Sequence, residues 1–148
     1  MNILIHRLEP EKTGDIPLPQ AMSAGSAGFD VFAAVEKELI LSPGETAAVP
    51  TGFAIAVPEG YEAQIRPRSG LALNHNIGIL NSPGTIDSDY RGEVRIIITN
   101  FSNRPFSLRR GERIAQLVVC PVIKFQWKEV DSLPQTDRAE GGFGHTGV

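Results

Sequence analysis

Apolar residues recur along this chain in short runs, and no window keeps the 3.6-residue period of an amphipathic helix. The run from Tyr61 to Arg66 alternates apolar and polar residues, as a strand with one buried face does. Similar β-prone runs are separated by clusters of glycine, proline, asparagine and serine. We therefore expect strands near residues 2–8, 29–33, 38–41, 53–57, 61–66, 77–80, 93–99, 114–119 and 124–130.

One helix is expected, a turn or two after Arg68, with Ser69 as its N-cap. Many short strands without alternating helices are typical of a sandwich, a jelly roll or a barrel. The glycine-rich phosphate motifs of Rossmann and P-loop domains do not occur. The pattern thus predicts an all-β fold.

Composition narrows the class of protein. A chain of 148 residues, 41% of them hydrophobic, is long enough for one domain with its own core. One cysteine and three histidines do not favour a structural zinc site. No apolar stretch reaches the length of a membrane span, and no signal peptide opens the chain, so we expect a cytoplasmic protein. A net charge of −3 does not favour direct nucleic-acid binding.

The C-terminal part differs from the rest. From Asp131 onward few core-forming residues occur, and residues 141–147 hold four glycines and one aromatic residue. We expect a β domain over residues 1–130 and an arm over residues 131–148. Such an arm is either flexible or ordered by a partner or ligand.

Two segments carry candidate chemistry. The first lies at the expected helix start, where Arg68 supplies a guanidinium, Ser69 a hydroxyl and Gly70 an open backbone. These groups together suit the binding of an anion. The alternative is an ordinary capped helical turn without a ligand. In residues 84–93, Asp87 could orient and deprotonate a water, and Tyr90 could lie against a sugar or base. An ordinary hairpin turn would use the same residue types.

Two further segments are equally open. Gln116 interrupts an apolar strand, and its amide needs either a main-chain partner or a ligand. In the tail, phosphate donors and one stacking aromatic could act together, or the tail could be disordered. The tail residues concerned are Arg138, Phe143, His145 and Thr146.

Taken together, in this order and at these spacings, the segments resemble the homotrimeric deoxyuridine triphosphatases (dUTPases). The run Ile-Asp-Ser-Asp-Tyr-Arg-Gly, joined to Arg-Ser-Gly-Leu-Ala and Gly-Phe-Gly, is highly specific. The resemblance implies a distorted jelly-roll subunit and a trimer. Each of its three sites would be assembled from all three chains, with the arm closing over a neighbour's site. The matching blocks are residues 24–31, 67–72, 84–93, 110–119 and 138–147.

The resemblance implies hydrolysis of dUTP to dUMP and pyrophosphate. This reaction would limit uracil incorporation into DNA and supply dUMP for thymidylate synthesis. Asp87 would activate the water that attacks the α-phosphorus. Tyr90 would pack under the deoxyribose and leave no room for a 2′-hydroxyl. Asn81 would read uracil, and the hairpin over residues 81–90 would exclude the methyl group of thymine.

The resemblance also assigns the phosphate contacts. Mg²⁺ would be bound through phosphate oxygens and water, with no protein ligand. Asp30 would have a supporting role, and Phe143 would stack on uracil. The phosphate chain would be held by Arg68, Ser69, Gly70 and Gln116, and its γ-phosphate capped by Arg138, His145 and Thr146.

Two departures from the family pattern stand out. His145 occupies a position where many members have serine, and Pro83 removes one backbone donor from the hairpin. Two other functions are compatible with the same fold or with a trimer of the same kind. One is a deoxycytidine triphosphate deaminase, and the other is a non-enzymatic trimer that binds a regulatory partner.

Overall fold

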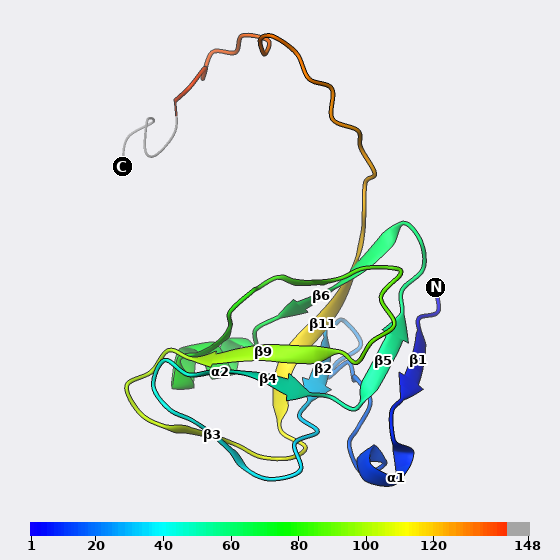
Figure 1. Cartoon of the computed structure of the whole chain (residues 1–148), viewed down its shortest axis with the longest axis vertical. Coiled ribbons are helices and arrows are strands. Elements are labelled where there is room, and N and C mark those ends of the chain that lie inside the picture. The colour runs from blue at the N-terminus through cyan, green and yellow to red at the C-terminus, as the bar shows by residue number, and fades with distance from the viewer. Residues whose placement is uncertain (142–148) are drawn as a thin grey trace.

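The computed structural model describes residues 1–141. Strands dominate, and two short helices, α1 (Pro10–Thr13) and α2 (Ser69–His75), interrupt them (Figure 1). The strands are β1 (Leu4–Arg7), β2 (Phe29–Phe32), β3 (Leu39–Leu41), β4 (Thr46–Pro50), β5 (Phe53–Ala56), β6 (Tyr61–Arg66), β7 (Ile77–Ile79), β8 (Gly84–Ile86), β9 (Arg95–Asn100), β10 (Phe106–Leu108) and β11 (Arg113–Pro121).

Antiparallel sheets enclose the core. One sheet has the strand order β2-β11-β6-β8 and another has the order β4-β9-β7, while β1 pairs with β5 and β10 with β3. Core side chains come from both larger sheets; Ile65 and Leu117 belong to the first, Val49 and Ile96 to the second. Each such buried side chain contributes about 1.5–3 kcal/mol. The expected all-β, jelly-roll fold is confirmed.

A buried amide holds the turn after β9 in place. The Asn100 side chain has no exposed surface and donates hydrogen bonds to the carbonyl oxygens of Leu41 and Arg104, at 2.9 and 2.8 Å. Its Oδ1 accepts from the backbone N–H and the hydroxyl of Ser102. This residue therefore joins the turn after β9 to the end of β3.

An ion pair anchors the N-terminal segment. Arg110 donates to both carboxylate oxygens of Asp15, at 2.8 and 2.6 Å, and to the carbonyl oxygens of Lys12 and Val35. The hydrogen bond from Arg110 lowers the pKa of Asp15 below its ordinary value. This contact ties helix α1, which the apolar pattern does not predict, to the turn before β11.

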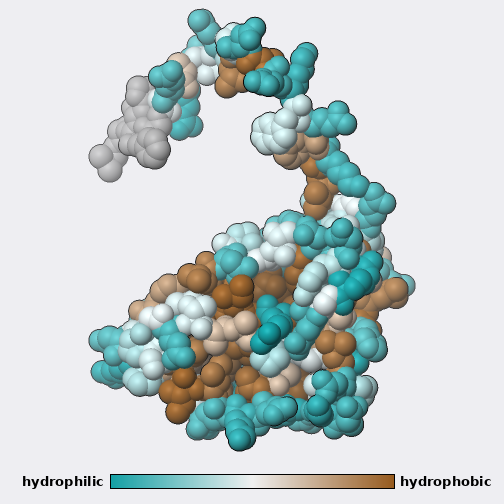
Figure 2. All heavy atoms as spheres, in the orientation of Figure 1, coloured by the Kyte–Doolittle hydropathy of each residue, from teal (hydrophilic) through white to brown (hydrophobic). Residues whose placement is uncertain are grey.

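The predicted strand over residues 124–130 is wrong. The last pairing of the chain ends at Pro121, and Val122 then donates one hydrogen bond to the carbonyl of Gly60. Beyond that point the segment leaves the sheets, and its brown side chains stand free in Figure 2. A strand needs a hydrogen-bonded neighbour, and no described strand pairs with this segment. Its exposed apolar residues include Ile123, Phe125, Trp127, Val130 and Leu133.

Smaller differences also separate the expected and observed elements. Strands β4, β8 and β10 have no clear apolar signal, since two of them have only three residues. Helix α2 is capped at Arg68, not Ser69, and no side chain makes the capping hydrogen bond. Within residues 1–141, no helix is long and apolar enough to cross a membrane.

Candidate functional site

A buried carboxylate organises one half of the candidate site. Asp30 on β2 is only 2% exposed. Its Oδ1 accepts a hydrogen bond from Gln116 Nε2 at 3.1 Å, and its Oδ2 accepts one from Arg113 Nη1 at 3.1 Å. Arg68 Nε lies 3.5 Å from the same Oδ2, and Arg68 Nη1 donates to the carbonyl of Arg113. Asp30 therefore fixes the two guanidiniums and the amide around it.

An irregularity in β11 explains why both Arg113 and Gln116 reach Asp30. Residues three apart in a regular strand point to opposite faces of the sheet. The register of β11 against β2 shifts between Arg113 and Ala115, which marks a β-bulge. The bulge turns Arg113 toward the face that Gln116 occupies. The alternation of side chains along a regular strand therefore could not have placed Arg113 in this cluster.

The predicted phosphate-binding residues surround this cluster. Ser69 and Gly70 begin α2 and are exposed, directly after Arg68. No heavy atom outside the immediate backbone lies within 4 Å of the position that a Cβ on Gly70 would occupy. A ligand can therefore approach the backbone at Gly70 closely. The structure brings Arg68 and Gln116 together around Asp30.

The second half of the candidate site follows β7. Asn81 packs against Gly84, where an added Cβ would lie 3.0 Å from Asn81 Nδ2. After β8, the backbone N–H of Tyr90 donates to the carbonyl of Asp87 at 3.2 Å and closes a turn. Arg91 Nη1, which sequence reasoning missed, donates to two carbonyl oxygens of this turn, at 2.7 Å each. The turn that carries Asp87 and Tyr90 is thus well ordered.

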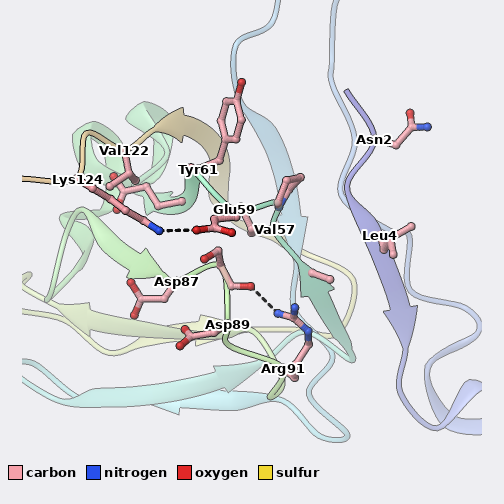
Figure 3. A pocket seen from close by; sticks show the side chains of 15 residues that line it. Asn2, Leu4, Val57, Glu59, Tyr61, Asp87, Asp89, Arg91, Val122 and Lys124 are labelled. Carbon is pink, nitrogen blue, oxygen red and sulfur yellow. Dashed lines mark hydrogen bonds and ion pairs between the residues drawn. The ribbon is translucent and has the colours of Figure 1, made fainter.

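Asp87 opens onto a cleft of about 930 Å³ between this turn and the β5–β6 connection. Its carboxylate makes no hydrogen bond or ion pair with any residue from 1 to 141, and Figure 3 draws no interaction between it and the other side chains that line the cleft. Asn81 and Tyr90 lie on the same segment but outside the lining of this cleft. An exposed, unpartnered carboxylate is free to accept a proton from water.

Charge distinguishes the two halves. The cleft beside Asp87 also carries the carboxylates of Glu59, Glu62 and Asp89. One of its cations, Lys124, is paired with Glu59 at 2.5 Å, and this hydrogen bond lowers the pKa of Glu59 (Figure 3). This half is acidic and would repel a polyphosphate. The half around Arg68 presents the guanidiniums that a polyphosphate needs.

The strand register separates the two halves within one chain. Gln116 on β11 pairs with Asp30 on β2 and with Arg66 on β6, so Asp30 lies level with Arg66. Ile86 on β8 pairs with Ala63 on β6, so the next residue, Asp87, lies level with Glu62. Four residues along β6 correspond to about 13 Å, and the three strand spacings from β2 to β8 to about 14 Å. Asp30 and Asp87 are therefore roughly 20 Å apart. One chain does not bring Asp87 close to the predicted phosphate-binding residues around Asp30.

The remaining predicted residues belong to the arm. Arg138 Nε donates to the carbonyl of Gly141 at 2.7 Å, within a local turn. Phe143, His145 and Thr146 lie outside the described residues. Among residues 1–141, no three histidine, cysteine, aspartate or glutamate side chains gather as a metal site.

Comparisons with known proteins identify the family of this chain. A model of the dUTPase family matches residues 14–147. A deoxyuridine 5'-triphosphate nucleotidohydrolase of Caldanaerobacter subterraneus subsp. tengcongensis is 50% identical over 148 residues, which is 100% of both chains. The one from Anaplasma marginale is 52% identical over 133 residues, 90% of each chain. The structure of Staphylococcus bacteriophage 80alpha dUTPase with dUPNHPP superposes with a TM-score of 0.87, at 27% identity and 99% coverage of each chain.

The family match spans nearly the whole chain, and a relative of the same length is identical at half of its positions. This protein therefore belongs to the dUTPase family, whose members hydrolyse dUTP.

Proposed function

We propose that this protein hydrolyses dUTP to dUMP and pyrophosphate through a water that Asp87 activates for attack on the α-phosphorus. The observation that carries the proposal is the exposed Asp87 carboxylate, without a partner among residues 1–141, on an ordered turn beside Tyr90. In the cell, the reaction would limit uracil incorporation into DNA and supply dUMP for thymidylate synthesis. We place it in the cytoplasm, acting on free nucleotides and not on nucleic acid.

The phosphate chain would bind the half-site around Arg68. Arg68, Ser69, Gly70 and Gln116 would contact its oxygens, because guanidinium, hydroxyl, amide and backbone N–H groups are all donors. Asp30 would serve as a support that holds Arg68 and Gln116 in orientation, since its own oxygens are already occupied. Fixed donors around the transferring group are the usual means of stabilising phosphoryl transfer.

Mg²⁺ fits this site as a partner of the substrate. No three acidic, histidine or cysteine side chains among the described residues are arranged to hold the ion, and Mg²⁺ binds readily to phosphate oxygens and water. The ion would neutralise part of the phosphate charge when it is bound. We assign it no protein ligand.

The base and sugar would bind the hairpin over residues 81–90. Asn81 would read uracil, and the narrow hairpin would reject a thymine methyl group by steric clash. Tyr90 would lie under the deoxyribose and exclude a 2′-hydroxyl. Tyr90 is 46% exposed and so is available for such a contact.

We further propose that the active form is a homotrimer with sites shared between subunits. The separation of the half-sites in one chain, roughly 20 Å from the strand spacings, supports this, because the acidic half of one subunit needs the basic half of another. The exposed Ile123, Phe125 and Trp127 also support it, since contiguous exposed apolar residues commonly mark an interface. The domain over residues 1–130 would form the body of the trimer.

The arm over residues 131–148 would close a neighbour's site. Arg138, His145 and Thr146 would cap the γ-phosphate, and Phe143 would stack on uracil. Closure of such an arm would exclude water other than the nucleophile.

Pyrophosphate release from dUTP, dTTP, dCTP and UTP with Mg²⁺, alongside an ammonia assay, tests the reaction. Release from dUTP alone is expected. Ammonia from dCTP would indicate a deaminase instead, and dUTP binding without any release would indicate a binding protein. Asp87→Asn should abolish turnover while dUTP still binds.

Asp89→Asn is the matched control, because it makes the same chemical change two residues away on the same turn. It should retain far more turnover than Asp87→Asn. Equal losses in both variants would contradict the assignment of the base to Asp87 alone.

Tryptophan fluorescence tests the assembly. Trp127 is the only tryptophan of the chain and is 90% exposed in the single subunit. In a trimer that covers the segment, its emission should lie at shorter wavelength than that of free tryptophan and shift to longer wavelength on dissociation. Sedimentation of a monomer that turns over dUTP would overturn the shared site.

A further inference from the structure

The ring of Tyr90 is held by the two residues after Arg91. Its hydroxyl donates a hydrogen bond to the carbonyl oxygen of Glu93 at 3.0 Å. The ring also covers Gly92, where an added Cβ would lie 2.4 Å from the Tyr90 oxygen and 2.6 Å from Cζ. The direction of the ring therefore depends on where the backbone of residues 92 and 93 lies.

That backbone is clamped through the side chain of Glu93. One carboxylate oxygen, Oε1, accepts hydrogen bonds from the backbone N–H groups of Thr51 and Gly52, at 3.2 and 3.0 Å. The next residue is held as well, because Thr51 Oγ1 donates to the carbonyl of Val94 at 2.5 Å, and Val94 N–H donates to the carbonyl of Phe53 at 2.9 Å. Three hydrogen bonds thus fasten residues 93 and 94 to the β4–β5 turn, and a fourth fastens Val94 to the first residue of β5.

The β4–β5 turn is itself a fixed support. Gly52 has a φ of +74°, and a Cβ there would lie 2.7 Å from Thr13 Cγ2, so the turn has little room to move. The carbonyl of Gly52 accepts a hydrogen bond from Leu8 N–H at 2.8 Å, and Thr51 is 3% exposed. The clamp on Glu93 therefore connects Tyr90 to the body of the domain.

We propose that Glu93 is a positioning residue for sugar selectivity, which holds the Tyr90 ring in place through its hydrogen bonds to the Thr51 and Gly52 amides. This rests on the proposed contact between Tyr90 and the deoxyribose. A ring that is free to turn or withdraw leaves space for a 2′-hydroxyl, so loss of the clamp should weaken the rejection of UTP more than it weakens turnover of dUTP.

Three variants separate this role from general instability. Glu93→Ala removes the acceptor of both amides. Glu93→Gln is the matched control, because both amides bond to the single atom Oε1, which the carboxamide oxygen can replace. Gly92→Ala, at an exposed position, displaces the Tyr90 ring directly by steric overlap. It serves as the reference for a displaced ring in each assay.

The kinetic readout is the ratio of kcat/KM for dUTP to that for UTP. We expect Glu93→Ala and Gly92→Ala to lower this ratio by about tenfold, whereas Glu93→Gln keeps it within about twofold of the parent. An unchanged ratio in a folded Glu93→Ala would overturn the proposal. Where Glu93→Ala fails to fold, Glu93→Asp takes its place, since its shorter side chain withdraws the carboxylate from the amides.

A second readout does not depend on activity. The chain has two tyrosines, so a Tyr61→Phe parent labelled with 3-fluorotyrosine reports on Tyr90 alone by ¹⁹F NMR. Glu93→Ala should move this resonance toward that of the unfolded chain, and Glu93→Gln should not. If the wild-type chain hydrolyses no dUTP, the proposed function fails, while the resonance still decides whether Glu93 positions Tyr90.

Discussion

Replacing Asp30 by asparagine tests the half-site that the buried carboxylate organises. The change keeps the size of the side chain but removes the charge that faces Arg68, Arg113 and Gln116. A hydrogen bond to a charged group contributes about 1.5–3 kcal/mol, and removing one partner of a fully buried ion pair costs about 3–5 kcal/mol. The side chains of Arg68 and Arg113 are 23% and 44% exposed, so part of their charge regains water. We therefore expect a loss of about 3 kcal/mol.

Urea unfolding at one fixed protomer concentration measures this loss, because assembly contributes to apparent stability. With a slope of about 1–3 kcal/mol per molar, the midpoint should fall by about 1–3 M. Asp15→Asn is the matched control, since it removes the same charge from a pair with Arg110 in which the carboxylate is 62% exposed. A midpoint that does not move in Asp30→Asn, or an equal fall in both variants, would refute the reasoning from burial.

Three further predictions concern other parts of the chain. Asn100→Leu should lower the free energy of unfolding by about 3 kcal/mol, because buried carbonyl groups lose their donor. Thermal unfolding would measure this loss. A change below about 1 kcal/mol would contradict the role of the amide. Because the pKa of Asp15 is lowered in the folded state, its contribution to stability is present above the ordinary carboxyl pKa and is lost as the pH falls below about 4. Acid titrations of the wild type and Asp15→Asn should therefore converge at low pH, and parallel curves would exclude the linkage. Truncation after Asp137 should leave a folded trimer with much reduced dUTP turnover, and loss of the trimer in sedimentation would show that the arm is structural.

The local pattern of apolar and polar residues was sufficient to predict much of the fold. Alternation over residues 61–66 and the apolar run of residues 114–119 identified the central strands β6 and β11, since each has one buried face. Short strands such as β8 and β10 carry too few residues for a period to emerge. The segment over residues 124–130 has the composition of a strand, but pairing depends on a neighbour that composition does not reveal.

Some residues of the candidate site could likewise be predicted from the sequence, and others could not. Arg68, Asp87 and Gln116 stood out because polar groups at a turn or within an apolar run need an explanation. Arg113 could not be placed from the sequence, because the bulge in β11 changes which face it occupies. Glu93 had no signal at all, since its partners are backbone N–H groups more than forty residues away in the chain. The separation of the two half-sites likewise follows from strand register and not from spacing in the sequence.

The distance between the half-sites has a consequence for inheritance. If each site takes its base from one chain and its phosphate donors from another, two defective alleles can complement each other. A chain with Asp87→Asn and a chain with Arg68→Ala would each form inactive trimers alone. Random mixing of equal amounts would leave about a quarter of all sites with both halves intact. A cell that carries both alleles would then contain an active enzyme that neither allele can make by itself.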